Sequence, residues 1–237
     1  MILPTGTTGR ERYPAYLTIF VIVLNVAFFM VEEVILRAQG QEGFLNILSQ
    51  VTFNVCKVGT DPLPQLALTG LASMFLHAGI AHILGNMWFL WIFGRKVEQY
   101  FGRIWFLVFY VAAGYMAIVG HILFGGVTCN TVTDGLLVGA SGAIAGVMGA
   151  FLFLYPMQNI NVAVLPMLNF KVPALFFLVF WFASDLLNGI GWAGGDADAV
   201  AHWAHIMGFA FGFAIVFLTT MFFKPAPEPD PFAYLDE

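Results

Sequence analysis

Charged residues are scarce in this chain of 237 residues. Asp, Glu, Lys and Arg make up 10% of it, whereas an ordinary soluble domain contains about 25%. Hydrophobic residues make up 60%, Phe alone occurs 26 times, and the mean hydropathy is +0.85. A soluble domain of this length cannot bury so much apolar surface, so the composition excludes a cytosolic globular enzyme and a disordered chain. It predicts a polytopic membrane protein.

Basic residues and cysteines are also few. Nine Lys and Arg and a net charge of −5 exclude a nucleic-acid binder that relies on phosphate contacts. The two cysteines, Cys56 and Cys129, form no CxxC or Cys/His spacing, so we expect no metal and no cofactor. The sequence leaves open whether they form an extracytoplasmic disulfide or remain free thiols, and we favour free thiols.

The apolar residues fall into six segments of about the length that crosses a bilayer as a helix. Short alternating strands are not evident, which favours a helical bundle over a barrel. We therefore expect an all-α fold with one membrane domain over residues 14–223, an N-terminal segment 1–13 and a disordered tail 224–237. The six expected spans are residues 14–31, 71–93, 104–124, 136–155, 172–187 and 199–223.

The basic residues predict the orientation of these spans. Arg37 and Lys57 lie on one side of the expected bundle, and the other seven basic residues lie on the side of the two termini. The positive-inside rule then places both termini in the cytoplasm. The loops around 32–70, 125–135 and 188–198 face outward, and residues 44–48 of the first loop are suited to a short interfacial helix.

Polar side chains inside the spans gather at one depth. They occur in the second, fourth and sixth spans, which all begin on the outer side. Polar groups in hydrocarbon are costly and usually functional, and a scattered structural set would not align in this way. The residues are His77, His82, Asn86, Ser141, His202 and His205.

This set has the chemistry of acyl transfer. Ser141 is a candidate nucleophile, and His205 or His202 could take its proton. His82 and Asn86 are four residues apart on one helix face, and both can donate hydrogen bonds to an oxyanion. Ser141 also lies near an expected helix N-terminus, where its backbone N–H is free.

No carboxylate is evidently placed to orient the histidine. Asp185 lies near the outer end of the fifth span, and we interpret it as a capping or loop-anchoring residue. We therefore expect a Ser–His dyad and not a triad. His77 lies about 140° from His82 around the expected helix, so its side chain should point elsewhere.

Small residues at helical spacing predict how the fourth and sixth spans meet. Stripes of this kind let two membrane helices approach closely, which would bring Ser141 within reach of a histidine. The two stripes are Gly142, Gly146 and Ala150, and Ala204, Gly208 and Gly212.

Three motifs on alternate spans resemble those of the rhomboid intramembrane serine proteases, and along the chain HxxxN comes first, GxSG second and AHxxGxxxG third. Gly139-Ala140-Ser141-Gly142 resembles the GxSG motif, and His82 followed by Asn86 resembles HxxxN. Ala204-His205 followed by Gly208 and Gly212 resembles AHxxGxxxG. The first outer loop departs from many relatives, because it lacks the Trp-Arg pair.

The resemblance implies a role for each matched residue. Ser141 would be the nucleophile and His205 the general base and acid. Asn86, His82 and the backbone N–H of Ser141 would form the oxyanion hole. Three glycines, Gly139, Gly142 and Gly208, would support the motifs, and Glu98 resembles a structural Glu at the inner end of the second helix.

The resemblance also implies a substrate class and a location. Substrates would be single-span or polytopic transmembrane proteins cut near the outer face, with lipid as the surroundings and no nucleic acid as partner. The protein would lie in a bacterial inner membrane. Substrates would reach the site laterally between the second and fifth spans, and the glycine-rich loop 188–198 would act as a cap.

Two other functions fit parts of the pattern. A proton-coupled transporter or channel could use the histidines as a relay, but the cytoplasmic halves of these spans contain almost no ionisable residue. A non-proteolytic protein that holds transmembrane helices would not need both Ser141 and His205. Covalent labelling of Ser141 separates a protease from both.

Overall fold

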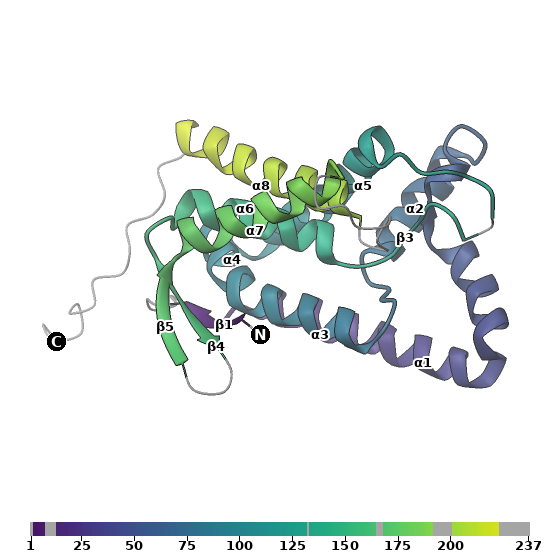
Figure 1. Ribbon diagram of the computed structural model, residues 1–237, viewed down its shortest axis with the longest axis horizontal. Helices are drawn as coiled ribbons and strands as arrows, with labels where there is room; N and C mark the ends of the chain where they lie inside the picture. Colours follow the sequence, from purple (N-terminus) through teal and green to yellow (C-terminus); the bar gives the residue numbers. More distant parts are fainter. Residues whose placement is uncertain (1, 8–12, 132, 165–167, 192–200, 223–237) are drawn as a thin grey trace, which may run out of the picture.

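A computed structural model describes residues 2–7, 13–131, 133–164, 168–191 and 201–222 (Figure 1). The described chain is mostly helical, as expected. Within the described residues, three helices are long and apolar enough to cross a membrane: α1 (Tyr16–Val51), α5 (Arg103–Phe124) and α8 (His202–Phe222). Two shorter apolar helices are α6 (Ser141–Leu154) and α7 (Ala174–Gly189). The expected count of six spans remains a prediction.

The first helix is much longer than the predicted span 14–31. α1 extends to Val51 through a break at Gly40, whose φ of 69° suits glycine. A large part of the predicted first outer loop is therefore helical, including residues 44–48. The buried residues of α1 recur every three or four positions, so one face packs on the bundle.

The predicted second span, residues 71–93, is not one helix. α2 (Leu63–Ser73) ends within it, and α3 (Ile80–Phe89) begins after a non-helical connection that contains His77. α3 continues through a π-helical turn, η2 (Leu90–Gly94), into α4 (Arg95–Phe101). Gly102, with φ of 75°, ends α4 and leads into α5.

Glu98 fixes the beginning of α1 against α4. This fully buried carboxylate accepts hydrogen bonds from the backbone N–H groups of Leu17 and Thr18, at 3.1 and 2.8 Å, and from the Thr18 hydroxyl at 2.8 Å. The first N–H groups of a helix lack partners within the helix, so Glu98 replaces the missing acceptors. A structural role, as implied by the resemblance, agrees with these contacts.

A small sheet modifies the expected all-α fold. β4 (Asn159–Val164) and β5 (Leu168–Pro173) form a hairpin between α6 and α7, and β1 (Ile2–Thr7) pairs with β4, so the strand order is β1-β4-β5. Figure 1 shows this sheet at one end of the molecule, beside the N-terminus. Ile160 and Val162 are buried and alternate with partly exposed neighbours, the period of a strand with one buried face. This short pattern, between two long apolar segments, was not predicted from the sequence.

α6 and α8 pack through their glycines, as the two stripes predicted. A Cβ on Gly208 would collide with the carbonyl oxygen of Gly142, and one on Gly212 with that of Gly146. The backbones are therefore in direct contact, which a larger residue would prevent. α6 is buried along most of its length.

A disulfide joins Cys56 to Cys129, so the expectation of free thiols is wrong. A second, two-stranded sheet of β2 (Phe53–Asn54) and β3 (Leu136–Leu137) brings the two loops together. The short 3₁₀ helix η1 (Val55–Lys57) carries Cys56 directly after β2. The pairing could not be read from two cysteines separated by 73 residues.

Asp134 organises the loop that follows Cys129. Its carboxylate accepts hydrogen bonds from the Thr131 hydroxyl at 2.6 Å and from the backbone N–H groups of Asn130 and Thr131 at 2.8 and 2.9 Å. These donors, first among them the Thr131 hydroxyl, hold the pKa of Asp134 below its ordinary value.

Beyond Gly191, the expected cap loop lies outside the described residues, and so does the expected tail 224–237.

Candidate active site

Ser141 is the first residue of α6 and follows a turn that requires glycine. Gly139 has a φ of +124°, and a Cβ at this position would lie 2.7 Å from Cε1 of His82. Its backbone N–H donates to the carbonyl of Ser73 at 2.9 Å, which ties the turn to the end of α2. The turn therefore holds the Ser141 side chain beside α3 and leaves the Ser141 backbone N–H in the first turn of a helix.

His205 meets Ser141 across the interface of α6 and α8. His205 Nε2 lies 2.8 Å from Ser141 Oγ, which is hydrogen-bond distance. The close glycine contacts of α6 and α8 make this approach possible. Of the two histidines that the sequence offered as partners of Ser141, the structure brings His205 to it.

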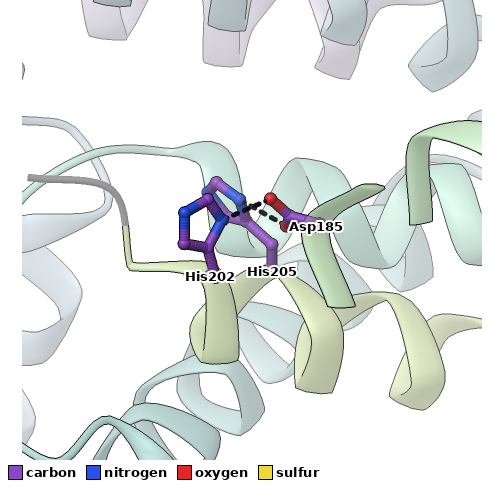
Figure 2. Close-up of side chains that lie close together, drawn as sticks. All are labelled: Asp185, His202 and His205. Atoms are coloured by element: carbon purple, nitrogen blue, oxygen red, sulfur yellow. Dashed lines mark hydrogen bonds and ion pairs between the residues drawn. The ribbon is translucent and has the colours of Figure 1, made fainter. Parts of the chain in front are cut away.

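Asp185 extends this pair to a chain of three side chains from three helices, although the sequence predicted no carboxylate beside the histidine. Its Oδ2 lies 2.9 Å from His205 Nδ1, and its Oδ1 lies 2.6 Å from His202 Nδ1 (Figure 2). An ionised carboxylate only accepts hydrogen bonds, so the proton of a neutral His205 is on Nδ1. Nε2 is then free to accept the proton of Ser141.

One signal in the sequence could have identified Asp185. It lies at the outer end of the fifth span, at the depth of the histidines, and Trp181 is one helical turn before it. The Trp181 ring lies 5.9 Å from the His205 ring, so both residues of α7 face His205. The depth of Asp185 was therefore visible in the sequence, whereas the side of α7 that faces α8 follows from the packing of the two helices.

His82 and Asn86 line one cavity with Ser141 and His205. The cavity has a volume of about 580 Å³, and its lining is mainly apolar apart from these groups. The Nδ2 of Asn86 is buried and has no hydrogen-bond partner among the described residues. An unsatisfied buried donor is costly, so this N–H₂ group is available for an acceptor that enters the cavity.

In a continuous helix His77 would point away from His82, but in the structure the two side chains lie against each other. It lies in the connection between α2 and α3, and its ring meets the His82 ring edge to face at 5.2 Å between centroids. The buried carboxylate of Glu32 accepts the His77 backbone N–H at 3.1 and 3.2 Å. His77 and Glu32 therefore support His82 from the side of α1.

Comparison with known proteins gives consistent matches to one family. The model of the Rhomboid domain matches residues 67–222, which include His82, Asn86, Ser141, Asp185 and His205. RHOMBOID-like protein 6, mitochondrial, of Arabidopsis thaliana is 32% identical over 151 residues, which are 64% of this chain and 43% of the relative. Presenilin-associated rhomboid-like protein A, mitochondrial, of Danio rerio is 30% identical over 141 residues, which are 59% of this chain and 34% of the relative.

A bacterial relative matches a shorter segment. Rhomboid protease GluP of Bacillus subtilis is 37% identical over 84 residues, which are 35% of this chain and 15% of the relative. The matched part is less than half the length of each of these three relatives. The likeness therefore concerns the membrane domain and not the whole of these proteins.

Proposed function

Because the chain belongs to the rhomboid family of polytopic membrane proteins, we propose that it is an intramembrane serine endopeptidase. It cleaves single-span or polytopic transmembrane proteins near the outer face of the membrane. The observation that carries this proposal is the 2.8 Å contact between Ser141 Oγ and His205 Nε2 in a cavity of about 580 Å³.

The first half of the reaction is acylation. Ser141 Oγ attacks the carbonyl carbon of the scissile bond while His205 Nε2 accepts its proton. The C–N bond then breaks as the imidazolium returns that proton to the departing amine. The product is an ester between Ser141 and the N-terminal part of the substrate.

The second half is hydrolysis. Water attacks the ester and gives its proton to His205 Nε2, and Ser141 recovers a proton as it leaves. Asn86, His82 and the Ser141 backbone N–H are the proposed donors to the oxyanion of both tetrahedral intermediates. Asp185 acts as a positioning residue, because it fixes the His205 tautomer and stabilises the imidazolium.

Substrate access is proposed between α3 and α7. Here the rings of Phe89 and Phe177 face one another at 6.5 Å between centroids. The two helices therefore meet through side chains and not through close backbone contact. A transmembrane helix that entered here would reach Ser141 after local unwinding, since a helical peptide bond is shielded. Gly189 and Gly191, at the end of α7, begin the proposed cap loop.

Orientation and location are part of the same proposal. We place both termini in the cytoplasm of a bacterium, with the protein in the inner membrane. The Cys56–Cys129 disulfide lies in the loops assigned to the outer side, and disulfides persist in oxidising compartments. Its position supports this orientation.

Covalent labelling tests the proposed nucleophile without knowledge of the substrate. A fluorophosphonate probe should label the wild-type protein in detergent, with the adduct mapped to Ser141 by mass spectrometry. Ser141→Ala should abolish labelling and His205→Ala should reduce it strongly. A folded wild-type protein that resists the probe would count against a protease and favour a non-proteolytic helix-binding protein.

A further inference from the structure

Asp185 lies between two histidines, and the proposed reaction uses one of them. His202 Nδ1 and His205 Nδ1 each approach a different carboxylate oxygen, at 2.6 and 2.9 Å (Figure 2). One ligand atom from each residue can be chosen so that all three lie within 4.8 Å of one another. Two imidazole nitrogens and a carboxylate oxygen are a common ligand set of zinc sites that keep a fourth position open.

We propose that Asp185, His202 and His205 bind a divalent transition-metal ion such as Zn²⁺, and that the bound ion inhibits the protease. The inhibition rests on the proposed function, since it assumes that His205 is the base. The proposed metal binding does not rest on that function, because it depends only on the three ligand residues.

The spacing of the ligand atoms is close to what such an ion needs. Zinc bonds of about 2.0–2.2 Å in a tetrahedron separate the ligand atoms by roughly 3.3 Å. The two N–O distances of 2.6 and 2.9 Å must therefore increase by about 0.7 and 0.4 Å to reach that separation. His202 begins α8, and the side chains of His202, His205 and Asp185 are 16%, 13% and 12% exposed, so the cluster is not sealed from solvent.

Binding would change the proton positions on His205 without a net gain or loss of protons. In the arrangement without metal, Nδ1 of each neutral imidazole carries its proton toward Asp185. When both Nδ1 atoms coordinate the ion, each ring keeps one proton, which moves through solvent to Nε2. His205 Nε2 then donates to Ser141 Oγ and no longer accepts, so Ser141 loses its base.

The binding test uses Co²⁺, whose tetrahedral complexes absorb visible light. Full-length Ser141→Ala protein without a histidine tag should develop this absorption with one equivalent of Co²⁺. Adding His202→Asn should abolish it, because an asparagine amide can still donate to Asp185 but does not replace an imidazole ligand. His121→Asn, on α5 and outside the cluster, is the matched control and should leave the absorption intact.

The inhibition test measures cleavage of a transmembrane reporter in the presence of Zn²⁺. Wild-type and His121→Asn proteins should lose at least tenfold in rate and recover when a chelator is added. The rate of His202→Asn, whatever its level without metal, should change by less than about twofold when Zn²⁺ is added. Equal inhibition of His202→Asn, or Co²⁺ absorption that is absent or survives His202→Asn, would overturn the proposal. A wild type that cleaves nothing would refute the protease function, while the Co²⁺ titration would still decide the metal site.

Discussion

His205 Nδ1 donates a hydrogen bond to Asp185 Oδ2 over 2.9 Å, while Nε2 of the same ring lies 2.8 Å from Ser141 Oγ. The three residues come from α8, α7 and α6. The orientation of the base therefore depends on α7, the helix that also borders the proposed route of the substrate. A movement of α7 that admits a substrate would act directly on the base.

Asp185→Asn tests this dependence. We expect kcat to fall by about 10²–10³-fold with little change in KM, because the neutral amide does not stabilise the imidazolium and can support the wrong tautomer. The measurement is steady-state cleavage of a transmembrane reporter by reconstituted protein.

The matched control for this variant is Ser184→Ala, which alters the exposed neighbour of Asp185 on the same helix. It should leave both constants within about twofold of the wild type. An unchanged kcat in Asp185→Asn would mean that Ser141 and His205 work as the dyad that the sequence suggested.

Gly212→Ala tests the close contact of α8 with α6. The added Cβ would collide with the Gly146 carbonyl oxygen, and backbone on both sides leaves little room to adjust. We expect the free energy of unfolding to fall by about 1–3 kcal/mol, measured by unfolding in mild detergent. Gly85→Ala on α3 is the control, since its Cβ would meet no atom within 4 Å. A loss in Gly85→Ala as large as in Gly212→Ala would contradict the packing argument.

The disulfide predicts a stability that depends on redox state. Replacing Cys56 and Cys129 with serine should lower the free energy of unfolding by up to about 4 kcal/mol, since the bond closes a long loop in the unfolded chain. The melting temperature of the double variant should match that of reduced wild-type protein. Alkylation and mass spectrometry of untreated protein check the bond itself, and two alkylated cysteines would refute it.

The depressed pKa of Asp134 predicts a pH effect in the loop after Cys129. Because the folded pKa lies below the unfolded one, the carboxylate stabilises the loop above its ordinary pKa. That contribution is lost as pH falls through the folded pKa. Thr131→Val removes the hydroxyl donor and should raise the Asp134 pKa toward its ordinary value, measured by carboxyl ¹³C NMR. An unchanged titration would show that the Thr131 hydroxyl does not hold the carboxylate.

The sequence predicted the site best where small residues recur at helical spacing on the same helices as the candidate catalytic residues. Four glycines recur at helical spacing, two on α6 and two on α8: Gly142, Gly146, Gly208 and Gly212. The contact between these helices could therefore be predicted, and with it a contact between Ser141 and a histidine of α8. The contact involves one face of each helix, and the small residues of each face can be recognised in the sequence of that helix alone.

The parts that were missed depend on how segments far apart in the chain meet. Whether Asp185 faces α8 or lipid is decided by the rotation of α7 about its axis, which the mostly apolar sequence of this helix does not reveal. The Cys56–Cys129 bond depends on the pairing of β2 with β3, two strands of two residues each. Gly79 directly precedes α3, the helix that carries His82, so His77 lies outside that helix. The apolar composition of residues 71–93 did not reveal this break between α2 and α3.

Cleavage by purified protein in lipid vesicles tests the central claim most directly. The substrate is a single-span reporter with small residues near its outer end, and the wild type is compared with Ser141→Ala and His205→Ala. We predict one cut in the outer half of the span by the wild type and none by either variant. Cleavage that persists in Ser141→Ala would contradict it.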